Sequence, residues 1–229
     1  LRPRLIVSEG SEALISSAVL SATDVDTDDQ NLVFLIIKQP KHGVMQLNNR
    51  PATKFTQQNV KDNLVKYIHT AGEIGTAIMK DSVTFIVSDQ NYLATADLPV
   101  YDLNITITPI DNSKPAIITG KEVSVKEGGS ITLTPDIITA KDPDTAPDEI
   151  QFMIVRQPQW GYVENIKPSP GSEKSNKGKR ITTFRLQDVI DGSINYVQAT
   201  HKGVEPVYDD MEVYATDGNH RSAIKNFGI

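Results

Sequence analysis

The stretch Thr84-Phe85-Ile86-Val87-Ser88-Asp89 decides the fold, because a related stretch appears a second time in the chain. It returns 128 residues later as Glu212-Val213-Tyr214-Ala215-Thr216-Asp217. Apart from Ile86, apolar and polar side chains alternate in both copies, which is typical of a β-strand with one buried face. Each copy ends on an aspartate, so a repeated strand leads into a repeated acidic loop.

Further landmarks recur outside this strand, which indicates that the whole unit is duplicated. Three of them return after 118 residues: Glu9-Gly10 as Glu127-Gly128, Asp24-Val25-Asp26-Thr27 as Asp142-Pro143-Asp144-Thr145, and Gln39-Pro40 with Gly43 as Gln157-Pro158 with Gly161. Tyr67 then matches Tyr196, an offset of 129 residues, so the second copy carries about 11 extra residues between Val163 and Arg180. We expect this Pro-, Ser-, Gly- and Lys-rich insert to be a surface loop.

The periodicity within each copy predicts an all-β chain of two sandwich domains, over residues 1–112 and 113–229. Leu103, Ile105 and Ile107 alternate with polar residues, and 32–37 is a continuous apolar run typical of a strand covered on both faces. One short helical turn per copy is expected, at 56–63 and 186–192. At the 128-residue offset Ile229 corresponds to Tyr101, so we expect the last strand of the second domain to be truncated.

The bulk properties exclude several classes of protein. The net charge of −6 argues against nucleic acid as a partner, because phosphate binding needs a basic surface. The absence of cysteine excludes disulfide frameworks and thiolate metal sites. No stretch approaches the roughly 20 apolar residues that span a bilayer, so we expect no membrane insertion. The chain, which does not begin with methionine, is interpreted as a piece of a longer protein.

The strand order predicts acidic groups at both ends of each domain. If the first strand runs downward, Glu9 and the loop to Glu73 lie at the bottom of the first domain, while Asp24, Asp26 and Asp89 lie at its top. Asp142, Asp144 and Asp217 would then lie at the top of the second domain. The linker residues Asp111 and Asn112 fall between the two sets, so we expect the acids to converge at this junction.

The motif residues resemble the CSPG repeat of the Fras/Frem extracellular matrix proteins and of the NG2-type chondroitin sulfate proteoglycan. Tyr67-Ile68-His69 with Gly72-Glu73, the run from Asp81 to Asp89, and the Gln39-to-Gly43 element carry the resemblance. Gln198 replaces the motif's histidine in the second copy. The resemblance implies two tandem cadherin-like or immunoglobulin-like Greek-key sandwiches, and a role in attaching epithelial basement membrane to the underlying tissue.

The Asp-x-Asp pairs are similar to cadherin calcium motifs, so we expect calcium as a cofactor. Calcium takes six to eight oxygen ligands from carboxylates, carbonyls and water. The predicted junction ligands are Glu9, Glu73, Asp111, Asn112, Asp142, Asp144 and Asp217, with a weaker upstream set of Asp24, Asp26 and Asp89. The linker 110–115 is a degenerate form of the cadherin linker, and the cadherin Leu-Asp-Arg-Glu motif is absent, which predicts fewer carboxylates and lower affinity. The competing interpretation is that these aspartates only form turns.

Other motifs carry weaker signals. Asn104-Ile105-Thr106 is a glycosylation sequon whose asparagine is expected to point outward. No serine, cysteine or metal-ligand spacing accompanies His69, which we interpret as a hydrogen-bonded loop residue, and His42, His201 and His220 lie in unrelated sequence contexts. Lys174, Lys177, Lys179 and Arg180 form a basic cluster in the insert, suited either to heparan sulfate or to simple solvation. The chain has no Ser-Gly dipeptide, so it is not expected to carry chondroitin sulfate.

These observations predict a non-catalytic extracellular structural and adhesive repeat pair, stiffened by calcium and located in basement membrane or at the cell surface. Its expected partners are matrix or cell-surface proteins, related family members among them. The alternative is a metal-independent module that binds a protein or glycan ligand through its surface loops. An enzyme is a formal third possibility, and the low aromatic content of 6% disfavours a glycosidase cleft.

Overall fold

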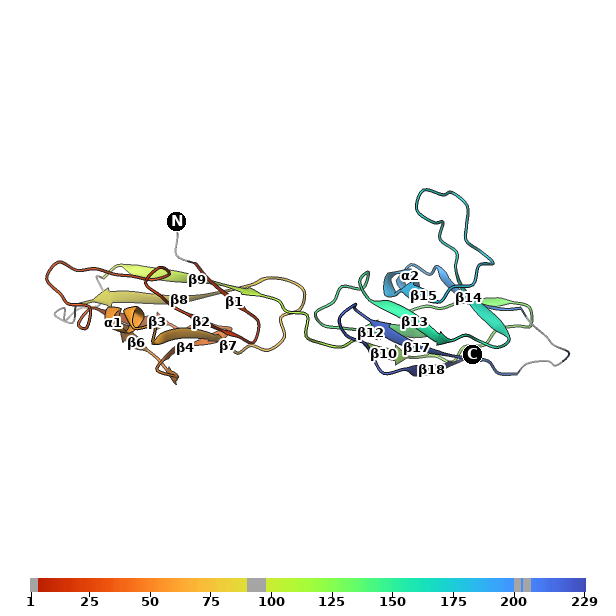
Figure 1. Cartoon of the computed structure of the whole chain (residues 1–229), viewed down its shortest axis with the longest axis horizontal. Helices are drawn as coiled ribbons and strands as arrows, with labels where there is room; N and C mark the ends of the chain where they lie inside the picture. The colour runs from red at the N-terminus through yellow and green to blue at the C-terminus, as the bar shows by residue number, and fades with distance from the viewer. Residues whose placement is uncertain (1–3, 90–97, 200–202, 204–206) are drawn as a thin grey trace. The chain divides into compact units, whose positions relative to one another are not determined.

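A computed structural model describes residues 4–89, 98–199, 203 and 207–229 of the chain (Figure 1). The chain divides into two compact units, Leu1–Ile110 and Asp111–Ile229. Each unit is a β-sandwich with one short helix, which confirms the predicted all-β class. Among the described residues, no helix is long and apolar enough to cross a bilayer.

The first unit packs a five-stranded sheet against a four-stranded one. The first sheet has the order β1 (Arg4–Ser8), β9 (Val100–Thr108), β8 (Met79–Ser88), β3 (Val33–Lys38), β6 (Lys54–Thr56), and the second β2 (Glu12–Leu14), β7 (Val65–His69), β4 (Gly43–Leu47), β5 (Arg50–Pro51). Strand β1 runs parallel to β9, and the other pairs are antiparallel. The chain crosses repeatedly between the sheets, as in a Greek-key sandwich.

The second unit repeats this plan. One sheet has the order β15 (Thr183–Arg185), β13 (Gln151–Arg156), β17 (Asp210–Thr216), β18 (Lys225–Gly228), and the other β11 (Ser130–Thr132), β16 (Ile194–Gln198), β14 (Gly161–Asn165), with β10 (Ala116–Thr119) and β12 (Ile138–Lys141) as a separate pair. Strands β13 and β14 begin 118 residues after β3 and β4, and β15 and β16 begin 129 residues after β6 and β7. The structural repeat therefore follows the sequence repeat, including the insert.

Alternating strands bury one face of each sheet between the two layers. In β9, Leu103, Ile105 and Ile107 are fully buried, as predicted, while Asn104 is exposed. Phe34 and Phe55 stack with ring centroids 5.1 Å apart, and the corresponding Phe152 and Phe184 stack at 5.0 Å. Each unit thus has its own apolar core, and the same aromatic pair lies in both.

The prediction that 32–37 is covered on both faces was wrong. Leu32 and Phe34 are buried, but the side chain of Ile37 is 52% exposed. The register between β3 and β8 shifts at Ile36/Lys38, which marks a bulge, and the outer face of the sheet meets solvent there. A continuous apolar run therefore does not by itself indicate a strand buried on both faces.

The predicted helical turns are confirmed as α1 (Gln57–Lys61) and α2 (Leu186–Ile190). Helix α1 begins where Thr56 and Asn59 cap each other, each side chain accepting from the other's backbone N–H at 3.2 and 2.9 Å. At α2 the Asp188 carboxylate accepts from the Arg185 N–H at 3.1 Å. Each helix leads into the strand that carries the repeated tyrosine, Tyr67 or Tyr196.

The register of the last strand corrects the expected correspondence of Ile229 with Tyr101. Leu103 pairs with Val83 in the first unit, and Phe227 pairs with Met211 in the second. Phe227 therefore corresponds to Leu103, an offset of 124 residues instead of 128, and Ile229 corresponds to Ile105. The stretch from Met211 to Phe227 is four residues shorter than that from Val83 to Leu103, which the offset of the preceding strand did not reveal.

The insert forms the loop that projects between β14 and β15 (Figure 1). Its base is tied down by Glu164, which is fully buried and accepts from the Gly178 N–H at 2.6 Å and from the Asn195 side chain at 3.2 Å. The side chains at its tip are exposed, as expected for a surface loop. The insert is thus a solvent-exposed loop with a buried polar anchor.

A buried aspartate organises the same four-way contact in each unit. Asp209 is 5% exposed and accepts from the Tyr196 hydroxyl at 2.7 Å. It also accepts from three backbone N–H groups, those of Gln159, Trp160 and Asp210, at 2.8–2.9 Å. Burial, with the hydrogen bond to Asp209 and the charge of Asp209, raises the pKa of Tyr196, so the hydroxyl remains a donor.

In the first unit Asp81 makes the equivalent contact. It accepts from the Tyr67 hydroxyl and from the backbone N–H groups of Lys41, His42 and Ser82.

This contact explains the Gln-Pro-x-x-Gly element. Gln157 holds the turn through a bond from its side chain to the Ile181 carbonyl at 2.9 Å, and the two residues after Pro158 donate to Asp209. A Cβ on Gly161 would lie 2.6 Å from the ring of Tyr196 and 2.5 Å from the Val197 carbonyl. Only glycine allows the tyrosine to cross this strand and reach the aspartate.

We expect Asp209→Ala to destabilise the second unit by about 3 kcal/mol or more, because it leaves four buried donors without an acceptor. Tyr196→Phe removes one of these bonds and should cost less, about 1.5 kcal/mol. Urea unfolding followed by circular dichroism measures both changes. Equal losses for the two variants would contradict the role given to the backbone donors.

Candidate cation site

Four of the predicted ligands come together in the second unit. Asp142 directly follows β12, Asp144 lies two residues later, and Asp217 directly follows β17. Asp111 is the first residue of the unit, and its side chain lies beside Asp217. Loops from three separate parts of the sequence thus bring carboxylates to one place.

Asp144 binds the backbone of the linker. Its Oδ2 accepts from the N–H groups of Asn112 and Ser113, both at 2.8 Å, and the residue is only 9% exposed. Burial raises its pKa, but the neighbouring Asp142 carboxyl and the hydrogen bonds from these N–H groups outweigh burial, and the net pKa is well below the usual range. Its second oxygen, Oδ1, is buried and has no hydrogen-bond partner among the described residues. Asn112, predicted as a ligand, is seen here as a backbone donor.

Asp142 has the opposite electrostatic environment. Burial, the close approach of the Asp144 carboxyl, and the charges of Asp144 and Asp217 raise the pKa of Asp142 to about 6. Its Oδ2 is buried and, within the described ranges, also lacks a hydrogen-bond partner. The negative charge of Asp142 is therefore held close to those of Asp144 and Asp217.

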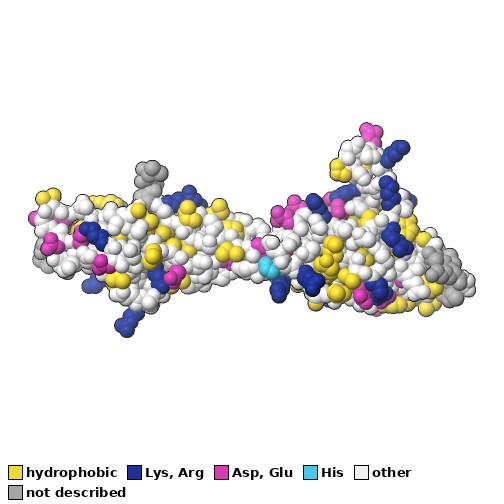
Figure 2. Space-filling view, viewed as in Figure 1, with side chains coloured by type: hydrophobic (Ala, Val, Ile, Leu, Met, Phe, Trp, Pro, Cys, Tyr) yellow, Lys and Arg dark blue, Asp and Glu magenta, His cyan; other side chains and the backbone are white. Residues whose placement is uncertain are grey.

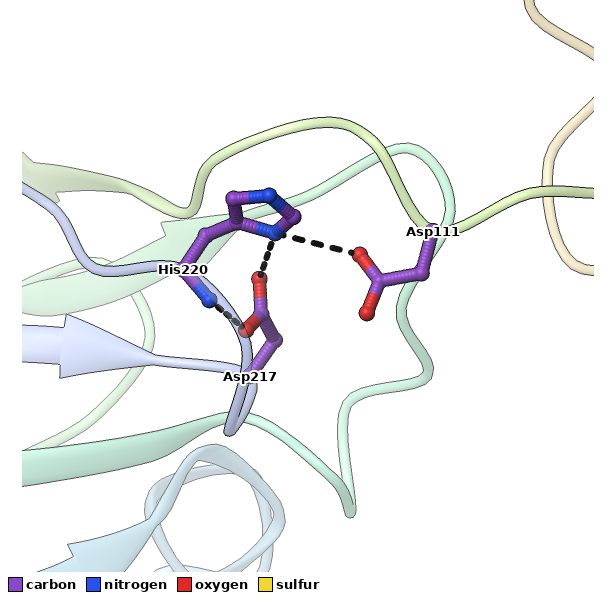
Figure 3. A group of neighbouring side chains, drawn as sticks. All are labelled: Asp111, Asp217 and His220. Carbon is purple, nitrogen blue, oxygen red and sulfur yellow. Dashed lines mark hydrogen bonds and ion pairs between the residues drawn. The ribbon is translucent and has the colours of Figure 1, made fainter.

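Asp217 and Asp111 face the imidazole of His220 (Figure 3). Asp217 has a side chain only 1% exposed, and its Oδ1 accepts from the N–H groups of Asn219 and His220 at 2.7 and 2.6 Å. Its Oδ2 points at His220 Nδ1 from 3.4 Å, and Asp111 Oδ1 lies at the same distance from that nitrogen. The Asn219 amide donates to the other oxygen of Asp111.

His220 and Asn219 belong to this group, although their sequence positions did not predict it. The ring nitrogen of His220 offers a ligand atom within 4.8 Å of those of Asp111 and Asp217, a grouping that the sequence did not predict. The available signal was its position three residues after Asp217, because a short turn brings such a residue back to the aspartate. The contact with Asp111, over a hundred residues away, needed the tertiary structure.

The upstream set is also brought together, in the first unit. The Asp24 carboxylate accepts from the Asp26 N–H at 3.1 Å. The hydrogen bond between the two carboxyl groups lowers the pKa of Asp24 and raises that of Asp26, which the charges of Asp24 and Asp89 raise further. Asp24 and Asp26 are both exposed, whereas Asp144 is buried, so solvent screens this set more strongly.

Glu9, Glu73 and His69 lie in the first unit. Glu9 is 6% exposed, and its Oε2 is buried with no hydrogen-bond partner among the residues described. Glu73 is exposed and accepts from the Gly75 N–H at 2.8 Å. His69 accepts from the Gly10 N–H through Nδ1 at 3.0 Å, as expected for a hydrogen-bonded structural histidine. The predicted contribution of Glu9 and Glu73 to the junction stays a prediction.

Comparison with known proteins identifies the family. A family model described as cadherin-like matches residues 1–107 and 115–229, nearly the whole of both units. The chain belongs to the cadherin-like family. This cadherin-like chain is 42% identical over 245 aligned positions to human FRAS1-related extracellular matrix protein 1, with 100% of the chain and 11% of that protein covered. Human FRAS1-related extracellular matrix protein 2 is 39% identical, with 100% and 7% covered.

These relatives confirm the resemblance to the Fras/Frem proteins, and the cadherin-like chain spans about a tenth or less of their length. Rat chondroitin sulfate proteoglycan 4 is more distant, 24% identical over 72% of the chain and 7% of that protein. The crystal structure of human CDH23 EC21-23 has a TM-score of 0.51 at 16% identity, with 99% of the chain and 70% of that structure covered. At this identity the likeness concerns the fold alone.

The second-unit cluster has the chemistry of a cation site. Asp142 Oδ2, Asp144 Oδ1 and Asp217 Oδ2 are buried oxygens that lack hydrogen-bond donors in the described part of the chain. Carboxylate oxygens that are buried without donors cost free energy unless a positive charge compensates them. Calcium prefers oxygen ligands of this kind, so the residues fit the ion that the family resemblance implied.

In buffer containing a chelator at pH 7, we expect Asp142→Asn to stabilise the second unit by on the order of 1 kcal/mol. A folded-state pKa of about 6 means that the charged carboxylate is held at a cost at neutral pH, and solvent screening reduces that cost. Asp136→Asn is the matched control with opposite sign, since a hydrogen bond from Lys121 lowers the pKa of Asp136 to about 2. Thermal unfolding of both variants tests this, and a destabilised Asp142→Asn protein would contradict it.

Proposed function

We propose that this chain is a pair of non-catalytic extracellular repeats with a structural and adhesive role in a matrix protein, stiffened by calcium. Asp111, Asp142, Asp144 and Asp217 would hold the ion in the second repeat, with Asn112 as a further candidate. The observation that carries the proposal is the set of three buried carboxylate oxygens without hydrogen-bond donors. The names of the relatives support the matrix setting.

Electrostatics explains how an ion would stiffen the repeat. Asp142, Asp144 and Asp217 carry like charges at one place, and without a cation their repulsion favours opening of the loops. Bound calcium would reverse the sign of this interaction. The Asp144 carboxylate also accepts from the N–H groups of Asn112 and Ser113. An ion bound to this carboxylate would therefore restrain the linker backbone as well. In this proposal the ion makes the start of the second repeat rigid.

We expect calcium to raise the melting temperature of the chain and Asp144→Ala to abolish the increase. At about a hundredfold excess over its Kd, calcium binding to the folded state alone stabilises it by about 2.7 kcal/mol. Differential scanning calorimetry with calcium and with a chelator measures the change, and Asp136→Asn should retain the full calcium response. A wild-type melting temperature that millimolar calcium leaves unchanged would disprove the proposed metal site.

The alternative of a metal-independent ligand module has one specific observation in its favour. Lys and Arg side chains stand along the projecting insert (Figure 2), where Lys174, Lys177, Lys179 and Arg180 are all exposed. The buried anchor at Glu164 fixes the base of this loop. A sulfated glycan is the matching anionic ligand. Binding to heparin that does not change with calcium, together with a flat calcium response, would favour this alternative.

The proposed location is extracellular, in basement membrane or at the cell surface, with matrix or cell-surface proteins and related family members as partners. Asn104 is exposed on β9 within the sequon Asn104-Ile105-Thr106, so its amide is accessible to a glycosyltransferase. We expect the chain secreted from animal cells to carry one glycan at Asn104. Removal by peptide N-glycosidase should shift its mass, Asn104→Gln should abolish that shift, and a secreted wild-type chain without the shift would disprove the assignment.

A further inference from the structure

We propose that Asp111, Asp217 and His220 form a binding site for a divalent transition-metal ion of the zinc class. The three side chains supply two carboxylate oxygens and one imidazole nitrogen. Two of its ligands, Asp111 and Asp217, also belong to the proposed calcium site. This is the only respect in which the inference rests on the proposed function. His220 distinguishes the zinc site from the calcium site, because it adds a nitrogen ligand to a set of oxygen ligands.

The geometry of the three atoms suits a small tetrahedral ion. His220 Nδ1 lies 3.4 Å from Asp111 Oδ1 and 3.4 Å from Asp217 Oδ2, and all three ligand atoms lie within 4.8 Å of one another (Figure 3). In tetrahedral zinc sites with bonds of about 2.0–2.2 Å, neighbouring ligand atoms are about 3.3–3.6 Å apart. The two pairs that include His220 Nδ1 therefore stand at the separation that a shared zinc ion requires, and the two carboxylate oxygens lie within 4.8 Å of each other.

These contacts are not already satisfied as hydrogen bonds. His220 Nδ1 and Asp217 Oδ2 are both buried and have no hydrogen-bond partner among the described residues, although they face each other. A charge-assisted N–H to carboxylate bond normally closes to about 2.7–2.9 Å. The longer separation leaves Asp217 Oδ2 without a hydrogen bond, and a metal ion between the two atoms would bind a lone pair of this oxygen and the lone pair of an unprotonated His220 Nδ1.

The remaining oxygens hold the site in place. Asp217 Oδ1 accepts from the N–H groups of Asn219 and His220, and Asp111 Oδ2 accepts from the Asn219 side chain, so each carboxylate keeps one oxygen free for the ion. The Thr216 hydroxyl donates to the His220 carbonyl at 2.6 Å and fixes the turn. Supporting hydrogen bonds of this type orient metal ligands and raise affinity.

Ligand chemistry predicts which ions this histidine recruits. Imidazole suits zinc, copper and nickel, whereas calcium and magnesium prefer oxygen ligands alone. Zinc should therefore depend on His220, and calcium should not. Because both ions need Asp111 and Asp217, each should weaken the binding of the other.

The test titrates tag-free chain with zinc chloride in calcium-free buffer at neutral pH, by isothermal calorimetry. We expect His220→Asn, which retains an oxygen ligand, to lower zinc affinity by at least about tenfold, the lower end of the loss seen when even a supporting group is removed. His42→Asn, a histidine of the first repeat, is the matched control and should bind zinc as the wild type does. Long-range proton–nitrogen spectra of the histidines should show zinc shifting the Nδ1 resonance of His220.

Equal zinc affinity in the wild type and His220→Asn, or an unmoved His220 Nδ1 resonance, would overturn the proposal. The calcium response of the His220→Asn melting temperature separates this result from the proposed function. If calcium stabilises both proteins and zinc binds neither, only the zinc site is wrong. If zinc binding requires His220 and calcium stabilises neither protein, only the calcium site is wrong.

Discussion

A buried aspartate that accepts from a buried tyrosine and three backbone N–H groups is the interaction on which each repeat depends. Asp81 with Tyr67, and Asp209 with Tyr196, join the start of one strand to a strand of the opposite sheet. A charge in the core is tolerated only when its hydrogen bonds are complete, and here four donors satisfy each carboxylate. The contact therefore constrains the sandwich more narrowly than apolar packing alone, which tolerates many arrangements.

This constraint also explains why the repeat retains particular residues at distant positions. Gly43 and Gly161 must lack a Cβ, because the ring of the repeated tyrosine lies against them. Gln157 must hold the turn that presents two backbone N–H groups to Asp209. Asp81 lies near the beginning of β8 and Asp209 directly before β17, and these strands end directly before Asp89 and Asp217. The core contact and the candidate cation site therefore lie at opposite ends of one strand, and the first sets the register that positions the second.

The two repeats use the same acidic loops in different environments. In the first repeat Asp24 and Asp26 are exposed, and solvent screens their repulsion. In the second repeat Asp144 is buried on the linker backbone, and Asp217 is closed in by the turn that carries His220. Carboxylate oxygens that are buried without hydrogen-bond donors are stabilised by a bound cation, whereas exposed carboxylates are already solvated by water. The same burial raises the pKa of Asp142 and makes its charge costly.

The sequence by itself determined the duplication, the all-β class, the helical turns and the pairing of Asp142 with Asp144, because offsets and periodicity are local properties of the chain. It also predicted that Asp111 and Asp217 would meet, since strand direction decides which loops share an end. Only the tertiary structure decided what depends on burial and register: the roles of Asp209 and His220, the exposure of Ile37, and the correspondence of Ile229 with Ile105. These features depend on contacts between residues that are far apart in the sequence, and the spacing of residues along the chain does not specify the distances in such contacts.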